Sequence, residues 1–386
     1  MRALFVSAVE RLASLRLAVV LLVLGMVLVV IATLDQVNLG IWAVQEKYFR
    51  SFLVFQELPG TGVAIPFFPG GYLIGGVLLA NLLCAQFLHF RLTWRNCGLH
   101  LTHFGLILLL VGELVTGLFS EESNLTLDTG ATRNYAESTF DTELAIVDAT
   151  DPAFDQVWAV PTDRLAARNP IPLPGGELIV QALEFHPNAQ LFWREQAPNA
   201  PALPATFGLG TRLALQPLPI TRRPNEENMP TALVELRAPA GVVGTALVSL
   251  QIGDPQIIEH GGRTYTVALR RARTYFDFAL TLLEFRHDKY PGTEIPRNFS
   301  SEVRLRTADG SEERAVRIFM NNPLRYGGYT FYQAGFQNND RTSILQVVKN
   351  PARHIPYLAC LLSGLGLTVH FLISLVGFLA RRRTHA

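Results

Sequence analysis

The chain has 386 residues, of which 49% are hydrophobic and only 17% are charged. Soluble globular domains usually carry about 25% charged residues, so this composition excludes a purely soluble enzyme and a disordered chain. Its 33 basic and 32 acidic residues leave a net charge of +1, which gives no electrostatic reason to expect a nucleic-acid partner. More than half of the chain lies outside the apolar stretches, which disfavours a compact helical transporter.

Apolar residues are concentrated in four blocks: Leu17–Leu34, Gly71–Phe90, Gly98–Phe119 and Ile355–Ala380. A membrane-spanning helix needs about 20 predominantly apolar residues, so each block predicts one. The first block is longer than the roughly 7–15 apolar residues of a signal peptide, and we expect it to be retained as a helix. Glu113, in the third block, is the only acidic residue in any of them.

Basic residues flank these blocks on one side of the membrane. They are Arg2, Arg11, Arg16, Arg91, Arg95, Arg381, Arg382 and Arg383. Since such residues favour the cytoplasmic face, we expect both termini inside and one large segment outside. The predicted organisation is a cytoplasmic start (1–16), helix one (17–34), an external link (35–70), helix two (71–90), a cytoplasmic link (91–97), helix three (98–119), an external domain (120–354), helix four (355–380) and a cytoplasmic end (381–386).

The first external link contains an apolar periodicity. Ile41, Val44, Tyr48, Phe52 and Phe55 recur at intervals of three and four residues, with polar residues between them. This spacing predicts an amphipathic helix that lies in the outer membrane interface. A helix packed on the external domain would show the same pattern, so both interpretations stay open.

The external segment consists mainly of alternating and β-branched runs. Asp309-Gly310 between two such runs is a strong hairpin signal, and Gly261-Gly262 joins another pair. The residues from Pro187 to Pro230 are rich in proline and predict a long ordered loop. The fold class is therefore a membrane protein of α + β type, with four helices and one or two antiparallel β domains of sandwich or barrel type. The clearest predicted strands are Glu143–Asp148, Glu177–Phe185, Thr231–Arg237, Thr264–Arg270 and Phe278–Phe285.

The three cysteines, Cys84, Cys97 and Cys360, lie in or next to the apolar blocks. The external segment therefore has no disulfide, and the absence of a CxxC pair excludes a thiol oxidoreductase or a zinc site of that type. A CxxCH sequence is also absent, so the chain is not itself a covalent c-type cytochrome.

Ionisable residues inside apolar helices are costly and are candidates for function by default. The strongest candidate is His103, which lies about one turn inside the cytoplasmic end of helix three. His100 lies on nearly the same face of that helix, and Glu113 and His370 are the other candidates. A neutral imidazole in hydrocarbon is a strong ligand for haem iron. The alternative for His103 is a structural histidine that bonds a neighbouring helix or reaches the interface. Glu113 is more simply a hydrogen-bond partner within the bundle, and the role of His370 stays open.

Three sequence elements, in this order, resemble a known family. LTHFGLILLLVGELVTG forms the third helix, YGGYTFYQAGFQ closes the external segment, and NPARHIPYLACLLSGLGL enters the last helix. Over essentially the whole chain the sequence resembles the ResB (CcsB) proteins of System II cytochrome c maturation. Each element alone is a weak signal, and their combination is fairly specific.

The resemblance implies a function in haem transport within a bacterial cytoplasmic (inner) membrane. A CcsA-like partner with a tryptophan-rich WWD segment would act with this chain, and the pair would attach haem to the CxxCH thiols of apocytochrome c. The third helix would supply one axial histidine to a transient haem b shared with the partner, and by motif this is His103. Catalysis would belong to the two-chain synthase, since the tryptophans of this chain form no WWD cluster.

Arg91 and Arg95 lie just outside the cytoplasmic end of helix three and are candidate contacts for haem propionates. The simpler interpretation, which we favour, is that they are ordinary cytoplasmic charges. A function of another class also stays open. The chain could be a haem-free, membrane-anchored sensor or scaffold with an external β domain that binds a ligand or partner. A cytochrome b redox subunit ranks last, because it needs two histidine pairs and only His103 and His370 lie deep enough.

Overall fold

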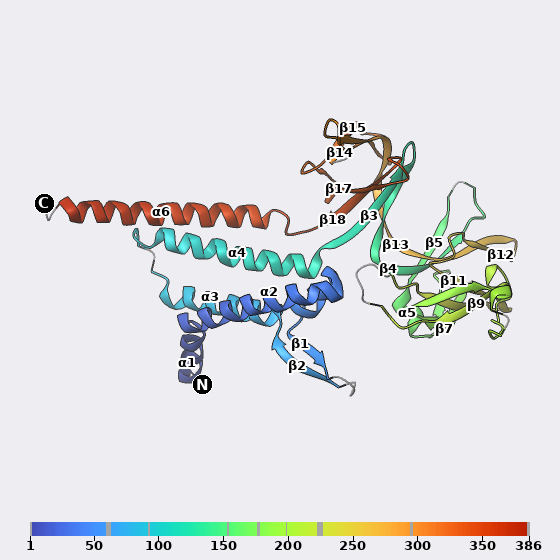
Figure 1. Ribbon diagram of the computed structural model, residues 1–386, viewed down its shortest axis with the longest axis horizontal. Helices are drawn as coiled ribbons and strands as arrows, with labels where there is room; N and C mark the ends of the chain where they lie inside the picture. Colours follow the sequence, from blue (N-terminus) through green and yellow to red (C-terminus); the bar gives the residue numbers. More distant parts are fainter. Residues whose placement is uncertain are drawn as a thin grey trace. The chain divides into compact units, whose positions relative to one another are not determined.

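The computed structural model (Figure 1) divides into two compact units. The helical unit consists of Met1–Ser120 and Asn350–Ala386, and the β unit is drawn from the chain between Glu121 and Lys349. The structure describes residues 2–58, 63–91, 93–152, 154–175, 178–197, 199–221, 227–293 and 296–383.

The helical unit contains the predicted apolar helices. Among the described residues, four helices are long and apolar enough to cross a membrane, which agrees with the four blocks in the sequence. A further helix, α1, lies in the segment expected only to be cytoplasmic. The elements are α1 (Arg2–Leu12), α2 (Leu15–Val44), the π-helical turn η1 (Gln45–Phe49), β1 (Leu53–Glu57), β2 (Ala64–Pro69), α3 (Gly71–His89), α4 (Cys97–Phe119) and α6 (Ile355–Arg383).

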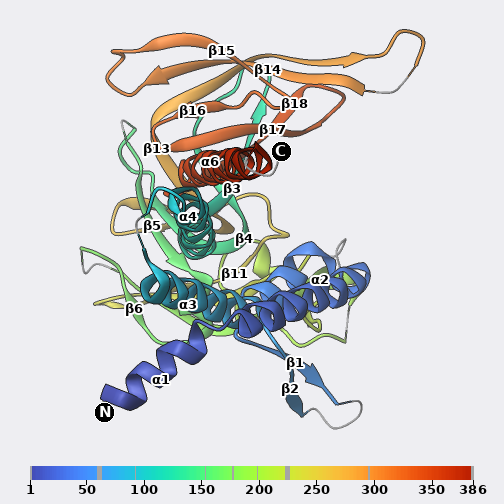
Figure 2. The ribbon, with the colours of Figure 1, turned by 90° about the vertical axis from the view of Figure 1, so that its left-hand side faces the viewer.

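The long helices pack as successive neighbours, α2 with α3, α3 with α4, and α4 with α6. Figure 2 views α4 and α6 nearly end-on and shows α6, α4 and α3 stacked in that order. Because the helices are arranged in a row, a large part of their apolar surface is exposed, notably along α6. Lipid or a partner protein has to cover such a surface.

The closest helix contact is a glycine seam between α4 and α6. Gly98, Gly105 and Gly112 are seven residues apart, a spacing that places them on one face of α4. A methyl group added at Gly105 would lie 2.7 Å from the carbonyl oxygen of Ala359, so the two backbones touch. At the end of the seam, the Asn350 side-chain amide donates a hydrogen bond to Thr116 Oγ1 at 3.1 Å.

Replacing Gly105 by leucine should separate α4 from α6. Forcing a large side chain into a close contact costs about 3 kcal/mol, and we expect a loss of this order in the stability of the full chain in detergent, measured by thermal unfolding. Gly364→Leu is the matched control, because a side chain at Gly364 on α6 meets open space. Equal unfolding temperatures for the two variants would show that the seam does not hold these helices together.

The link between α2 and α3 differs from the sequence prediction. The first helix continues past Leu34 to Val44, with a kink at Gly40 (φ 77°) that glycine adopts without strain. Asp35 bridges the kink by accepting hydrogen bonds from Lys47 Nζ and the Tyr48 hydroxyl, both at 2.9 Å.

The prediction of an amphipathic helix over Ile41–Phe55 is therefore wrong for the second half of that segment. Helical structure ends at Phe49, and Leu53–Glu57 pairs with Ala64–Pro69 as the hairpin of β1 and β2. Spacing along the chain could not reveal this outcome, because the hydrogen bonds of the hairpin come from a second segment. Residues 59–62 lie outside the described residues.

Two long strands, β4 and β13, run through the whole β unit. The sequence predicts separate strands over Thr264–Arg270 and Phe278–Phe285, but both belong to the single strand β13. Its pairing with β4 shifts register between Arg271 and Arg273 and again between Tyr275 and Leu280. Register shifts bend a strand locally, so β4 and β13 each contribute to two separate cores. Their bounds are Thr132–Asp148 and Arg263–Lys289.

The first core is a sandwich. A sheet in the order β11, β10, β7, β6 packs on the first half of β13, the second half of β4 and β5. Alternate residues of both layers, such as Val180, Val234 and Val267, are fully buried between them. The additional strands are β5 (Gln156–Pro161), β6 (Ile171–Pro172), β7 (Ile179–His186), β10 (Thr231–Ala238), β11 (Gly241–Ser249) and β12 (Gln256–His260), with the short helix α5 (Thr162–Ala166).

The second core lies inside a strongly curved sheet. Its order is β15, β14, β13, β4, β3, β18, β17, β16, and β15 at one end contacts β16 and β17 near the other. The sheet therefore curls around one interior, in which Leu280, Leu305 and Phe331 are fully buried. Asp309-Gly310 forms the predicted turn between β14 and β15. The additional strands are β3 (Glu121–Asp128), β14 (Pro296–Thr307), β15 (Glu313–Phe319), β16 (Leu324–Tyr326), β17 (Tyr329–Gln337) and β18 (Thr342–Lys349).

The segment from Pro187 to Pro230 is not the uninterrupted loop that was expected. Ala189–Trp193 (β8) pairs with Leu213–Pro217 (β9) in a small sheet of its own. The two strands have five residues each and lie nearly twenty residues apart, so neither shows a pattern strong enough to be read locally. Residues 222–226 of this segment lie outside the described residues.

The YGGYTFYQAGFQ element has a structural role. Gly327 and Gly328 both have positive φ and make the turn between β16 and β17. Phe331 fills the second core, and Gln333 accepts a hydrogen bond from the buried Ser301 hydroxyl at 2.6 Å. Buried polar groups must be paired in this way. The motif therefore specifies a turn, a core residue and a polar network.

Candidate functional site

His103 lies six residues after the first residue of α4, about 9 Å along the helix. It comes five residues after Gly98, so its side chain leaves the helix roughly 140° away from the glycine seam. The side chain is half-buried, and no described residue forms a hydrogen bond or ion pair with it. Leu99 and Leu106 beside it are exposed apolar side chains. His103 is thus an accessible imidazole with apolar surroundings.

His100, three residues earlier, is a structural residue. It is 6% exposed, and Gln86 Nε2 donates a hydrogen bond to its Nδ1 at 2.9 Å. Its Nε2 donates to the Arg91 carbonyl oxygen at 3.1 Å, and the Phe90 ring lies 4.8 Å away. These bonds use both ring nitrogens and require the tautomer with the proton on Nε2. His100 therefore has no nitrogen left for a ligand.

The remaining sequence-predicted residues are distributed around this end of α4. Arg91 and Arg95 are exposed in the link that precedes α4, at the same end of the helix as His103. His370 packs its backbone against Gly98, and its Nδ1 is buried without a hydrogen-bond partner. The enclosed Nδ1 makes His370 a poorer ligand candidate than His103.

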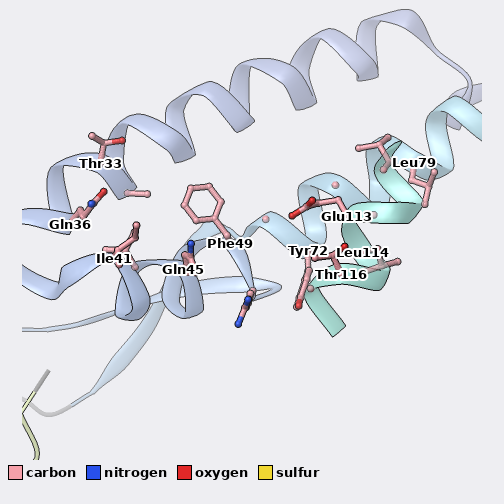
Figure 3. A pocket seen from close by; sticks show the side chains of 18 residues that line it. Thr33, Gln36, Ile41, Gln45, Phe49, Tyr72, Leu79, Glu113, Leu114 and Thr116 are labelled. Carbon is pink, nitrogen blue, oxygen red and sulfur yellow. The ribbon is translucent and has the colours of Figure 1, made fainter. Parts of the chain in front are cut away.

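A cavity of about 590 Å³ opens at the other end of the helical unit. Its size is within the range of small-molecule sites, about 300–1,000 Å³. Residues of α2 on both sides of the Gly40 kink form one wall together with η1, and α3 and α4 form the opposite wall (Figure 3). The main lining residues are Thr33, Gln36, Ile41, Gln45, Phe49, Arg50, Tyr72, Gly75, Gly76, Leu79, Leu110, Glu113, Leu114 and Gly117.

Glu113 is the acidic residue in the lining of this cavity. The side chain is exposed, points into the cavity, and has no hydrogen-bond or ion-pair partner among the described residues. It therefore does not act as the hydrogen-bond partner within the bundle that the sequence suggested. Sequence reasoning missed the cavity itself, since its walls come from α2, α3 and α4. The local signals were the Gly75-Gly76 pair and the single acidic residue of the apolar blocks.

Leu110 and Gly117 connect the two regions, because they lie seven and fourteen residues after His103 on the same face of α4. The cavity therefore begins about 10 Å along the helix from His103. No group of three or more His, Cys, Asp or Glu residues suited to a metal ion occurs in the described part of the chain. Among the described residues, a metal here would have fewer than three such ligands and would need further groups from outside the chain.

Comparison with known proteins finds a family match for one segment of the chain. Residues 240–343, which run from β11 to the start of β18, match the model of the ResB-like family. This part of the chain is similar to the ResB-like family. The matched region includes β13 to β17 of the curled sheet, with the YGGYTFYQAGFQ element, and it lies outside α4.

A curated relative of this ResB-like chain is Protein NrfI of Wolinella succinogenes. The two are 38% identical over 92 residues, which is 23% of this chain and 10% of NrfI. The chain thus spans about a tenth of the length of the relative it matches. Together, the apolar helices and the family match indicate that this chain is a membrane protein.

Proposed function

We propose that this ResB-like chain is the haem-handling subunit of a cytochrome c maturation system. It acts with a CcsA-like membrane partner, and the pair carries haem from the cytoplasm to the outer face for covalent attachment to the CxxCH thiols of apocytochrome c. The observation that supports this most is His103, an accessible imidazole without an internal partner on an apolar helix.

The surroundings of His103 suit haem as cargo. A neutral imidazole is a good axial ligand for haem iron, and the exposed Leu99 and Leu106 offer an apolar surface to the ring. A single histidine completes only one axial position, so the other ligand comes from the partner. The haem is held without covalent bonds to this chain, as a haem b in transit.

Arg91 and Arg95 are placed to act at the mouth of this site. Both are exposed in the link at the end of α4 that carries His103. With the termini of the chain and this link in the cytoplasm of a bacterial cell, haem enters from that side with its propionates towards the arginines. Guanidinium groups bind carboxylates well because they offer paired N–H donors. The same residues also serve as the charges that orient the chain in the membrane.

Deleting the gene tests the proposed function. We expect the strain to lose its c-type cytochromes, measured by haem staining of membrane and periplasmic fractions after denaturing electrophoresis. A plasmid copy of the gene should restore them. Retention of every c-type cytochrome in the deletion strain would contradict the proposal and favour a haem-free sensor or scaffold whose β unit binds an external ligand.

A further inference from the structure

We propose that the cavity between α2, α3 and α4 is a binding site for a membrane quinone in its quinol form. This site is separate from His103 and goes beyond the proposed function. It rests on the volume, the walls and the unpaired polar groups of the cavity, none of which the haem proposal uses.

The walls of the cavity suit a flat ring. Gly75 and Gly76 present bare backbone, and a methyl group added at either would meet no atom within 4 Å. Apolar side chains such as Leu79, Leu110 and Phe49 complete the walls. Because α2, α3 and α4 are apolar enough to cross a membrane, a lipid-soluble molecule can reach the cavity from the bilayer.

Polar side chains are divided between the two walls. Gln36 and Gln45 come from α2 and η1, whereas Tyr72 and Glu113 come from α3 and α4 (Figure 3). In the described part of the chain none of these four side chains forms a hydrogen bond or ion pair. A benzoquinone ring carries oxygens at opposite ends, so one oxygen can meet the glutamine amides and the other can meet Tyr72 and Glu113.

Glu113 favours the reduced form of such a ligand. A carboxylate only accepts hydrogen bonds, and a quinol hydroxyl donates one where a quinone oxygen cannot. An unpaired carboxylate within an apolar helix is costly, and a quinol hydroxyl would satisfy it. Tyr72 and the glutamine amides can serve either form, because they also donate.

Other occupants fit the cavity less well. Its lining contains no His, Cys or Met to ligate haem iron. The carboxylate of Glu113 would repel haem propionates and lipid phosphates alike. Arg50 is the cation in the lining, and it is paired with Glu46 at 2.9 Å. A neutral ring with hydroxyl groups therefore matches the charges better than an anion.

The test uses the full chain in lipid nanodiscs with decylubiquinol and decylubiquinone as probes. Trp42 follows the cavity residue Ile41, so quenching of tryptophan fluorescence can report binding. Gly75→Leu should abolish saturable binding, because the side chain fills the cavity. Gly25→Leu is the matched control, since Gly25 on α2 also faces open space but does not line the cavity. It should bind like the parent.

A second variant tests the chemistry. Glu113→Gln should weaken quinol binding roughly tenfold, as expected for the loss of a hydrogen bond to a charged group, with little change for the quinone. Glu57→Gln in β1 is the control. Absence of saturable binding to the parent chain, or equal binding by the Gly75→Leu and Gly25→Leu variants, would overturn the proposal. His103→Ala should leave quinol binding intact, so this proposal and the haem proposal fail independently.

Discussion

The His103→Ala variant of the two-chain complex is expected to lose its b-type haem almost completely. The alanine side chain cannot ligate iron, and His100 cannot replace His103 because both of its nitrogens are already bonded. The measurement is the Soret absorbance and the pyridine haemochrome content of the purified complex, relative to protein. Imidazole added during purification should partly restore the haem, since it can occupy the space that the side chain leaves.

His370→Ala is the control for this experiment. His370 also lies in an apolar helix, but its Nδ1 is enclosed and its backbone packs on Gly98, so its loss should leave the haem content close to that of the parent. Full haem content in His103→Ala, or loss of haem in His370→Ala alone, would disprove the ligand assignment. Restoration by imidazole distinguishes lost ligation from misfolding, because a misfolded complex would not regain haem.

Phe331→Ala is expected to destabilise the β unit by about 3–5 kcal/mol, the usual cost of removing a buried phenylalanine. Phe331 is fully buried in the second core, where its ring centroid lies 5.7 Å from that of Phe276 and 6.0 Å from that of Phe278. The curled sheet closes around this cluster, so the cavity left by alanine cannot easily collapse. Urea unfolding of the full chain in detergent, followed by the β-sheet circular dichroism signal, measures the loss.

Phe140→Ala is the matched control, because Phe140 in β4 is 54% exposed. Its substitution should change the free energy of unfolding by no more than about 0.5 kcal/mol. If both variants unfold at the same urea concentration, the second core does not determine the stability of the β unit. A strong effect of Phe331 alone would show that the YGGYTFYQAGFQ element contributes to the stability of the β unit.

Short-range sequence patterns predict many of the helices and turns of this chain. The four apolar blocks became helices because the length and composition of a segment are local properties. Asp309-Gly310 formed its hairpin turn because Gly310 readily adopts positive φ (70°). The third helix was also predicted in this way, and the match of residues 240–343 to the ResB-like family agrees with the resemblance seen in the sequence. The role of His103 in haem ligation stays a prediction.

Sequence patterns did not predict the contacts between segments that lie far apart in the chain. Two predicted strands proved to be one, since the register shifts of β13 depend on its partner β4. The hairpin of β1 and β2 replaced part of a predicted helix because the pairing hydrogen bonds come from Ala64–Pro69. Strand order within the curled sheet likewise joins β3 to β18, more than two hundred residues later.

The sequence by itself determined which ionisable residues lie in the apolar blocks, namely the few histidines and the one carboxylate. Only the tertiary structure decided which of them have hydrogen-bond partners. His100 and His103 are three residues apart on one helix, yet Gln86 and the Arg91 carbonyl bond the first and leave the second without a partner. Glu113 faces a cavity because Gly40 bends α2 and the glycines of α3 leave space. A pattern along one helix cannot contain the neighbours that make this difference.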